Sequence, residues 1–134
     1  MATRRDDNTV STEYKRGLQL ARAGEWFAAH EAFELAWRAA GRAERDFFQG
    51  LVHAVVFSYQ TTRGRTVGAE RQRAKAIRRL GPYAPVRRGL DVERLVAALV
   101  RAEPDLREQL VERDAEPPVA VEEEEQPERD QGRA

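Results

Sequence analysis

Apolar residues recur along the chain at helical spacing, and the strict apolar–polar alternation of a half-buried strand is missing. β-Branched residues are sparse outside 51–57. Glycines separate the periodic stretches, at Gly24, Gly41, Gly64 and Gly81, and glycine commonly ends a helix. The pattern predicts helices over 12–23, 25–40, 44–62, 68–80 and 92–102, a loop over 82–89 and a short sixth helix over 104–113.

Short connections between consecutive helices favour antiparallel neighbours, so we expect an all-α fold, a compact antiparallel bundle of about five helices. A chain of 134 residues suits one domain. Residues 114–134 hold eight acids against two arginines, with three prolines and no aromatic residue, a composition that does not offset the entropy of ordering. We therefore predict a flexible N-terminus over 1–11, the bundle domain over 12–113 and a disordered acidic tail over 114–134.

The second expected helix places a histidine on its apolar face. At about 100° per residue, His30 falls on one stripe, within roughly 60°, with the large apolar residues Trp26, Phe33 and Trp37. Residues four apart are neighbours on a helix surface, so His30 and Glu34 can reach a common atom. Such a pair is typical of a metal-binding or acid/base site, and also of an imidazole that is hydrogen-bonded inside a core.

The third expected helix is apolar nearly all round, which is typical of a buried, central helix. Three of its polar residues nevertheless lie within about 40° of one another, Gln49, His53 and Gln60. Unpaired polar groups in an interior cost roughly 1–3 kcal/mol each. We therefore expect these side chains to meet His30 and Glu34 of the preceding, antiparallel helix.

This contact predicts a polar cluster between the second and third helices. Gly50, beside Gln49, would allow the two backbones to approach closely. We predict that the cluster binds a small polar ligand or a metal, which could serve hydrolytic chemistry. The ligand-binding candidates are His30, Glu34, Trp37, Gln49, His53 and Gln60, and the metal-binding candidates among them are His30, Glu34 and His53.

Two stretches of the chain are similar to a known family. The run GEWFAAHEAFELAWR over 24–38 and the run FFQGLVHAVVFSYQ over 47–60 resemble the domain-of-unknown-function family 309, in which an EAHE-x-x-E-x-x-W motif precedes an LQGLIQ-like helix. The resemblance extends over 14–99 and implies a small helical bundle of unassigned activity. The polar and structural signature residues that it implies here are His30, Glu31, Glu34, Trp37, Gln49 and Gly50. The chain departs from the family pattern where Ala-Ala precedes His30, and at His53 and Gln60, where the family often has Gln and His.

Two other features indicate alternative functions. Residues between Gly17 and Ala36 match the spacing of a tetratricopeptide repeat, but a 34-residue shift fails at Ser58. The single repeat-like hairpin supports one alternative function, a helical protein-interaction module. Basic residues also cluster over 63–88 and could contact phosphates, but aromatic residues for base stacking are nearly absent there. We expect a solvated helix face and keep weak nucleic-acid binding as the alternative, with Arg71, Arg73, Arg78 and Arg79 as its candidates.

Composition excludes several classes of protein. There is no cysteine, so disulfides, thiolate nucleophiles and Cys-ligated zinc are ruled out. No stretch approaches the roughly 20 apolar residues that span a bilayer, and the first eleven residues lack the apolar region of a secretory signal. We therefore expect a cytoplasmic protein with no membrane partner. The sequence does not decide whether the protein is an enzyme, which small ligand, cofactor or protein partner it takes, or whether it forms a homo-oligomer.

Overall fold

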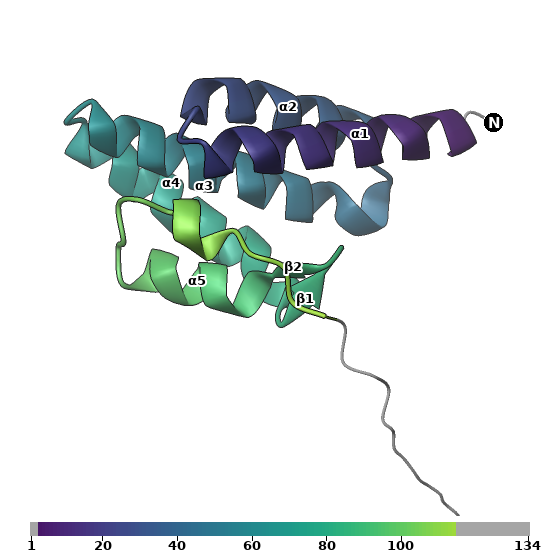
Figure 1. Cartoon of the computed structure of the whole chain (residues 1–134). Coiled ribbons are helices and arrows are strands. Elements are labelled where there is room, and N and C mark those ends of the chain that lie inside the picture. Colours follow the sequence, from purple (N-terminus) through teal and green to yellow (C-terminus); the bar gives the residue numbers. More distant parts are fainter. Residues whose placement is uncertain (1–2, 115–134) are drawn as a thin grey trace, which may run out of the picture.

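The computed structural model describes residues 3–114 and folds them into an all-α antiparallel bundle of five α-helices (Figure 1). Each helix packs against the one that follows it along the chain. Among the described residues, no helix combines the length and the apolar character that a bilayer crossing requires. The helices are α1 (Thr3–Arg22), α2 (Trp26–Ala39), α3 (Arg45–Thr62), α4 (Thr66–Leu80) and α5 (Val92–Val100).

The α1–α2 and α3–α4 hairpins use the same turn. Its glycine, Gly24 in the first and Gly64 in the second, has a positive φ of 79° and 72° respectively. In both turns the glycine N–H donates to the carbonyl three residues earlier (2.9 and 3.0 Å), and the next N–H donates to the carbonyl five residues earlier (2.9 and 3.0 Å). These bonds satisfy the last carbonyls of the preceding helix, and only glycine adopts this φ without a steric cost. The glycines that predicted the ends of these two helices therefore have a structural reason.

Two other glycines let the paired helices touch. A Cβ atom on Gly17 of α1 would lie 2.4 Å from Cε1 of Phe33 in α2, and one on Gly50 of α3 would lie 2.6 Å from Cγ of Leu80 in α4. Both distances are below van der Waals contact, so only glycine fits without a shift. The prediction that Gly50 brings α3 close to α2 is wrong, because the residue that fills its place comes from α4.

The core joins the two hairpins. Tyr14 of α1 lies with its ring centroid 6.0 Å from that of Phe47 and 5.9 Å from that of Phe48, both in α3. The two phenylalanines are fully buried, as are Leu95 and Leu99 of α5. The helices α3 and α4 lie between the α1–α2 pair and α5 (Figure 1). Burial of α3 on several sides agrees with its nearly continuous apolar character.

The two ends of the described chain differ from the expectation. Helix α1 begins at Thr3, so residues 3–11, expected as part of a flexible N-terminus, are helical. The sixth helix predicted over 104–113 is wrong, because this segment contains only a 3₁₀ turn, Arg107–Gln109. The residues predicted as an acidic tail lie outside the described residues, apart from Asp114.

The loop predicted over 82–89 contains ordered structure. After a 3₁₀ turn (Gly81–Tyr83), the strands β1 (Val86–Arg87) and β2 (Leu90–Asp91) form a small antiparallel hairpin. Its turn residues, Arg88 and Gly89, both have positive φ, 53° and 77°, as a tight two-residue hairpin requires. Between residues 3 and 114, β1 and β2 are the only strands, and one isolated bridge is the only other strand-like pairing.

The last described segment closes the bundle. Leu90 of β2 forms an isolated bridge with Glu112, and Nε of Arg22 in α1 donates to the carbonyl of Leu110 (2.6 Å). The side chains of Leu106 and Leu110 are buried, at 0% and 1% exposure. This segment therefore packs against the core without being helical.

Candidate functional site

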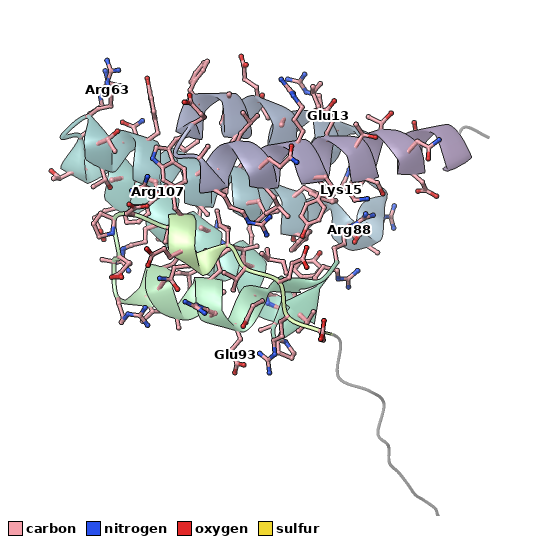
Figure 2. The ribbon with its side chains drawn as sticks, viewed as in Figure 1. Glu13, Lys15, Arg63, Arg88, Glu93 and Arg107 are labelled. Carbon is pink, nitrogen blue, oxygen red and sulfur yellow. The ribbon has the colours of Figure 1, made fainter. Side chains whose placement is uncertain are left out.

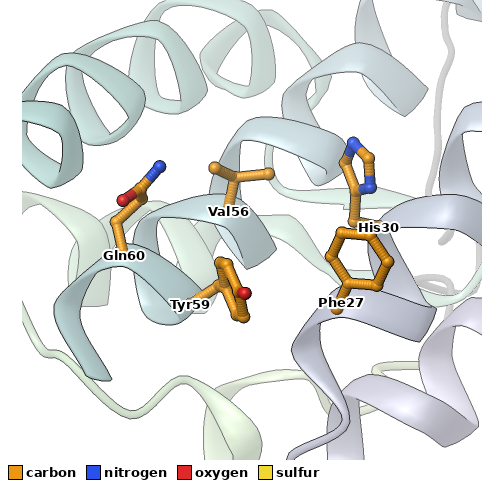
Figure 3. A pocket seen from close by; sticks show the side chains of 5 residues that line it. All are labelled: Phe27, His30, Val56, Tyr59 and Gln60. Carbon is orange, nitrogen blue, oxygen red and sulfur yellow. The ribbon is translucent and has the colours of Figure 1, made fainter. Parts of the chain in front are cut away.

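A pocket lies between α2 and α3, on a face that both helices share. Its volume is about 180 Å³, and five residues line it, Phe27 and His30 from α2 and Val56, Tyr59 and Gln60 from α3. Figure 3 shows the two α2 side chains facing the three from α3 across this space. The structure thus brings together two of the six predicted ligand-binding residues, His30 and Gln60.

The walls of the pocket are largely aromatic and apolar. The ring centroid of Phe27 lies 5.8 Å from that of His30 and 5.9 Å from that of Tyr59, distances typical of interacting rings. Phe27 is 56% exposed, and the guanidinium carbon of Arg63 lies 5.5 Å from the centroid of the Tyr59 ring. An exposed aromatic side chain beside a partly enclosed cavity can contact a bound molecule directly.

Two polar atoms of the pocket residues have no hydrogen-bond partner. Nδ1 of His30 and Oε1 of Gln60 are both buried and unpaired among the described residues. The other ring nitrogen of His30, Nε2, lies 3.7 Å from Oε2 of Glu34. A proton on Nε2, next to this carboxylate, leaves Nδ1 as a hydrogen-bond acceptor. A buried acceptor without a donor is costly, and these two atoms are the polar groups of the pocket residues whose hydrogen bonds the described residues do not supply.

Glu34 itself lies outside the pocket. Its carboxylate is also 3.8 Å from Nη2 of Arg38, one turn further along α2. It lines a separate surface depression with Arg16 of α1 and Glu31 of α2. The predicted pair of His30 and Glu34 is therefore present as neighbours on α2, with the imidazole facing the pocket and the carboxylate facing solvent.

His53 makes its contact with α4. Its Nδ1–H donates to Oε1 of Gln72 (2.7 Å), so the predicted meeting of this side chain with α2 is wrong. Burial lowers the pKa of His53, the hydrogen bond to Gln72 opposes that change, and the nearby cations Lys75, Arg79 and Arg78 lower the pKa further. This side chain is therefore neutral over a wider pH range than an exposed histidine.

The remaining two candidates do not line the pocket. Trp37 is half-buried and packs against the hydrophobic core. Gln49 is half-buried on α3. Together with His53, Val56 and Gln60 it follows a four-three-four spacing, which places these side chains along one face of the helix.

The predicted metal-binding set is not assembled. Between residues 3 and 114, no group of three or more histidine, aspartate or glutamate side chains is placed to hold a metal ion. His30 and Glu34 lie on α2, whereas His53 is hydrogen-bonded to α4. The ligand set that the sequence suggested is therefore divided between two helix interfaces.

The four arginines predicted for nucleic-acid binding are divided in the same way. Arg73 pairs with Glu70 (2.8 Å) and donates to the carbonyl of Leu99 at the end of α5 (2.7 Å). Arg79 pairs with Asp46 of α3 (2.7 Å). The other two, Arg71 and Arg78, are exposed. The structure thus uses half of this set for internal contacts.

Sequence reasoning missed three pocket residues, Phe27, Val56 and Tyr59. Val56 lies between His53 and Gln60 in the four-three-four spacing on α3, so the sequence could have placed it on the same face as these polar residues. Phe27 stands beside Trp26, which is buried, and one-residue neighbours on a helix point about 100° apart. The sequence showed that Phe27 faces away from Trp26, but not that it borders a cavity.

The fold and the pocket define the class of protein: a small all-α bundle with a partly apolar cavity between two antiparallel helices. Residues 14–72 match the family model described as a domain of unknown function, DUF309, so this stretch of the chain is similar to that family, as the resemblance predicted. The match contains all five pocket residues. No curated protein and no solved structure matches the chain.

Proposed function

We propose that the protein binds a small, mainly apolar molecule in the pocket between α2 and α3, and that this molecule donates hydrogen bonds to the protein. The observation that supports the proposal most is the pair of buried acceptors, His30 Nδ1 and Gln60 Oε1, which lack partners beside apolar walls. Apolar walls give affinity, and a few placed polar groups give orientation.

The size of the pocket limits the ligand. Its volume is about 180 Å³, slightly more than an engineered cavity of roughly 150 Å³ that holds benzene and less than the roughly 300–1,000 Å³ of pockets for drug-sized molecules. A ligand with one ring or two fused rings fits this range. The rings of Phe27 and Tyr59 would then contact the faces or edges of a planar ligand.

The polar atoms limit its chemistry. Gln60 Oε1 accepts hydrogen bonds, and His30 Nδ1 accepts them in the tautomer with its proton on Nε2, facing Glu34. A ligand with an N–H or O–H group at the edge of its ring pairs with such acceptors. A ligand that only accepts would leave them unpaired, which lowers affinity.

Two isosteric probes test this proposal, indole, which has an N–H donor, and benzofuran, which has none. We expect indole to shift the NMR resonances of Val56 and Tyr59 in the full chain, and to bind roughly two- to tenfold more tightly than benzofuran, as one net hydrogen bond predicts. The Gln60→Leu variant should reduce this difference. Gln49→Leu, on the same face of α3 but outside the pocket, is the matched control and should retain it.

A second variant separates binding from folding. Val56→Trp fills the cavity, so it should abolish the indole shifts at Tyr59 while circular dichroism reports an unchanged helix content. The proposal is overturned if indole shifts no pocket resonance in the wild-type chain. It is also overturned if the affinity difference between indole and benzofuran is the same in Gln60→Leu as in Gln49→Leu.

A further inference from the structure

The outward face of α4 carries three cations in a row. Arg71, Lys75 and Arg78 follow one another at four- and three-residue spacing, which places them on one side of the helix over about 10 Å. All three are exposed. None of them forms an ion pair or a side-chain hydrogen bond with another residue of the described chain, in contrast to Arg73 and Arg79 on the flanks of the same helix. We call this surface, formed by Arg71, Lys75 and Arg78, the α4 basic face.

No acid of α4 lies on this face. Glu70 is the sole carboxylate of the helix, and it is held by two hydrogen bonds from Arg73 (2.9 and 2.8 Å) on the side towards α5. The other side chains on this face are Val67, one turn before Arg71, and Ala74, between Arg71 and Arg78, and both are exposed and uncharged. Three like charges on neighbouring turns repel one another, so an anionic partner would be stabilised there.

The chain carries a complementary segment of its own. Residues 114–134 hold eight acids and two arginines, which leaves the rest of the chain at +6 because the total charge is zero. Four of these acids are consecutive, Glu122–Glu125, and Glu128 and Asp130 follow closely. The opposite charges of domain and tail therefore balance within one chain.

The tail also starts at a suitable place. The N–H of Arg113 donates to the carbonyl of Gly89 (2.8 Å), so the described chain ends beside the β1–β2 hairpin. Helix α4 ends at Leu80 and leads into this hairpin, and Figure 2 shows Arg88 of the hairpin on the opposite side of the molecule from Arg63, which lies just before the first residue of α4, Thr66. The eight residue steps from Asp114 to Glu122 span up to about 26 Å when extended, slightly more than the roughly 22 Å length of the 15-residue α4.

We propose that the α4 basic face is the docking surface for the chain's own acidic segment, residues 122–130. A segment tethered to the same chain has an effective concentration in the millimolar range, whereas an external polyanion must compete with it from solution. The contact is made of exposed ion pairs, so it is weak and sensitive to salt. The docked segment covers the face and excludes other anions from it. This inference concerns a different surface from the α2–α3 pocket and does not depend on the proposed ligand.

Because the chain has no cysteine, one spin label can be placed without other changes. In the full chain with Gln126→Cys carrying a nitroxide, we expect selective broadening of the amide resonances of Arg71, Lys75 and Arg78. The broadening should disappear in 0.5 M salt, where the Debye length is roughly 4 Å. It should also disappear in the triple variant Arg71→Glu, Lys75→Glu, Arg78→Glu.

A matched control reverses the same number of charges elsewhere. Lys15→Glu, Arg42→Glu and Arg101→Glu change three exposed cations on other elements, and the broadening on α4 should remain. The proposal is overturned if the label broadens no α4 resonance in the otherwise unchanged chain. It is also overturned if the two triple variants show the same broadening of the α4 resonances. If α4 is not broadened but fluorescein-labelled oligothymidine binds the wild-type chain and not the α4 variant, the face serves an external polyanion and the proposed occupant is wrong.

Discussion

The two helical hairpins have the same backbone arrangement and different surfaces. A shift of 40 residues along the chain relates Gly24 to Gly64, the two turn glycines. The same shift relates Ala29 to Ala69 and Ala36 to Ala76, which are all nearly or fully buried. Small residues at the same places after the same turn therefore let both pairs of helices pack closely.

The hairpins differ beside these shared positions. In α1–α2 the close contact is apolar, with the ring of Phe33 against Gly17. In α3–α4 polar contacts lie beside it, between His53 and Gln72 and between Asp46 and Arg79 (2.7 Å each). The comparison teaches that turns and small residues determine which helices pair, whereas the residues flanking the contact determine the chemistry of the surface.

The largest expected effect comes from filling the close contacts. Gly17→Ala should lower the free energy of unfolding by about 1–3 kcal/mol, because its Cβ would meet the rigid, fully buried ring of Phe33. Gly50→Ala should destabilise for the same reason, because its Cβ would lie 2.6 Å from Cγ of the fully buried Leu80. In both helices the better helix propensity of alanine, about 1 kcal/mol over glycine, offsets part of the cost. Chemical denaturation measures both, and Gly41→Ala, with no atom near its Cβ, is the control. If Gly17→Ala and Gly41→Ala have the same free energy of unfolding, the first hairpin is not closely packed.

A smaller effect tests whether the two turns are equivalent. Gly24→Ala and Gly64→Ala should each cost about 1–2 kcal/mol, since both place a side chain at positive φ. Gly64 has no neighbour within 4 Å of a Cβ, so this variant measures the backbone cost alone. Gly64→Asn should be milder, because asparagine tolerates this conformation. If Gly64→Ala has the stability of the wild-type chain in thermal denaturation, the shared turn does not determine the second hairpin.

The smallest expected effect concerns the polar contacts of the second hairpin. Burial lowers the pKa of His53 below its usual 6.5, so the folded chain binds this proton less tightly than the unfolded chain. The contribution of His53 to stability is therefore complete above about pH 6.5 and falls as the pH drops through the folded pKa. An NMR titration should give a pKa below 6.5, and Gln72→Leu should lower it further by removing a hydrogen bond that favours the charged form. A His53 pKa at or above 6.5 would contradict this account.

The fold class and most helix ends could be predicted from the sequence, because glycine has a local conformational reason to end a helix. The start of α1 could not, since residues 3–9 carry no apolar position and only Val10, 2% exposed, begins the buried stripe. The false sixth helix has a similar cause. Leu106 and Leu110 are four residues apart and both buried, which imitates a helical period, but the backbone there pairs with β2 through Glu112.

The candidate site was partly predictable for a geometric reason. A helical wheel gives the angle between side chains of one helix, so it correctly grouped Gln49, His53 and Gln60 on α3. It does not tell which neighbouring helix lies at that angle. His53 therefore lies against α4, while Gln60 lines the pocket with His30 of α2, and this division required the three-dimensional arrangement.

The hydrogen bond from Arg22 to Leu110 links residues 88 positions apart, while the helix pairs form between segments that are close in sequence. At about 5–20 residues per second, a ribosome needs roughly 4–18 s to add those 88 residues. Helical hairpins form in far less time than this. The nascent chain therefore holds a paired α1 and α2 for several seconds while the surface that later contacts Leu106 and Leu110 is open, and a chaperone that binds apolar surface has its best access to the growing chain during this interval.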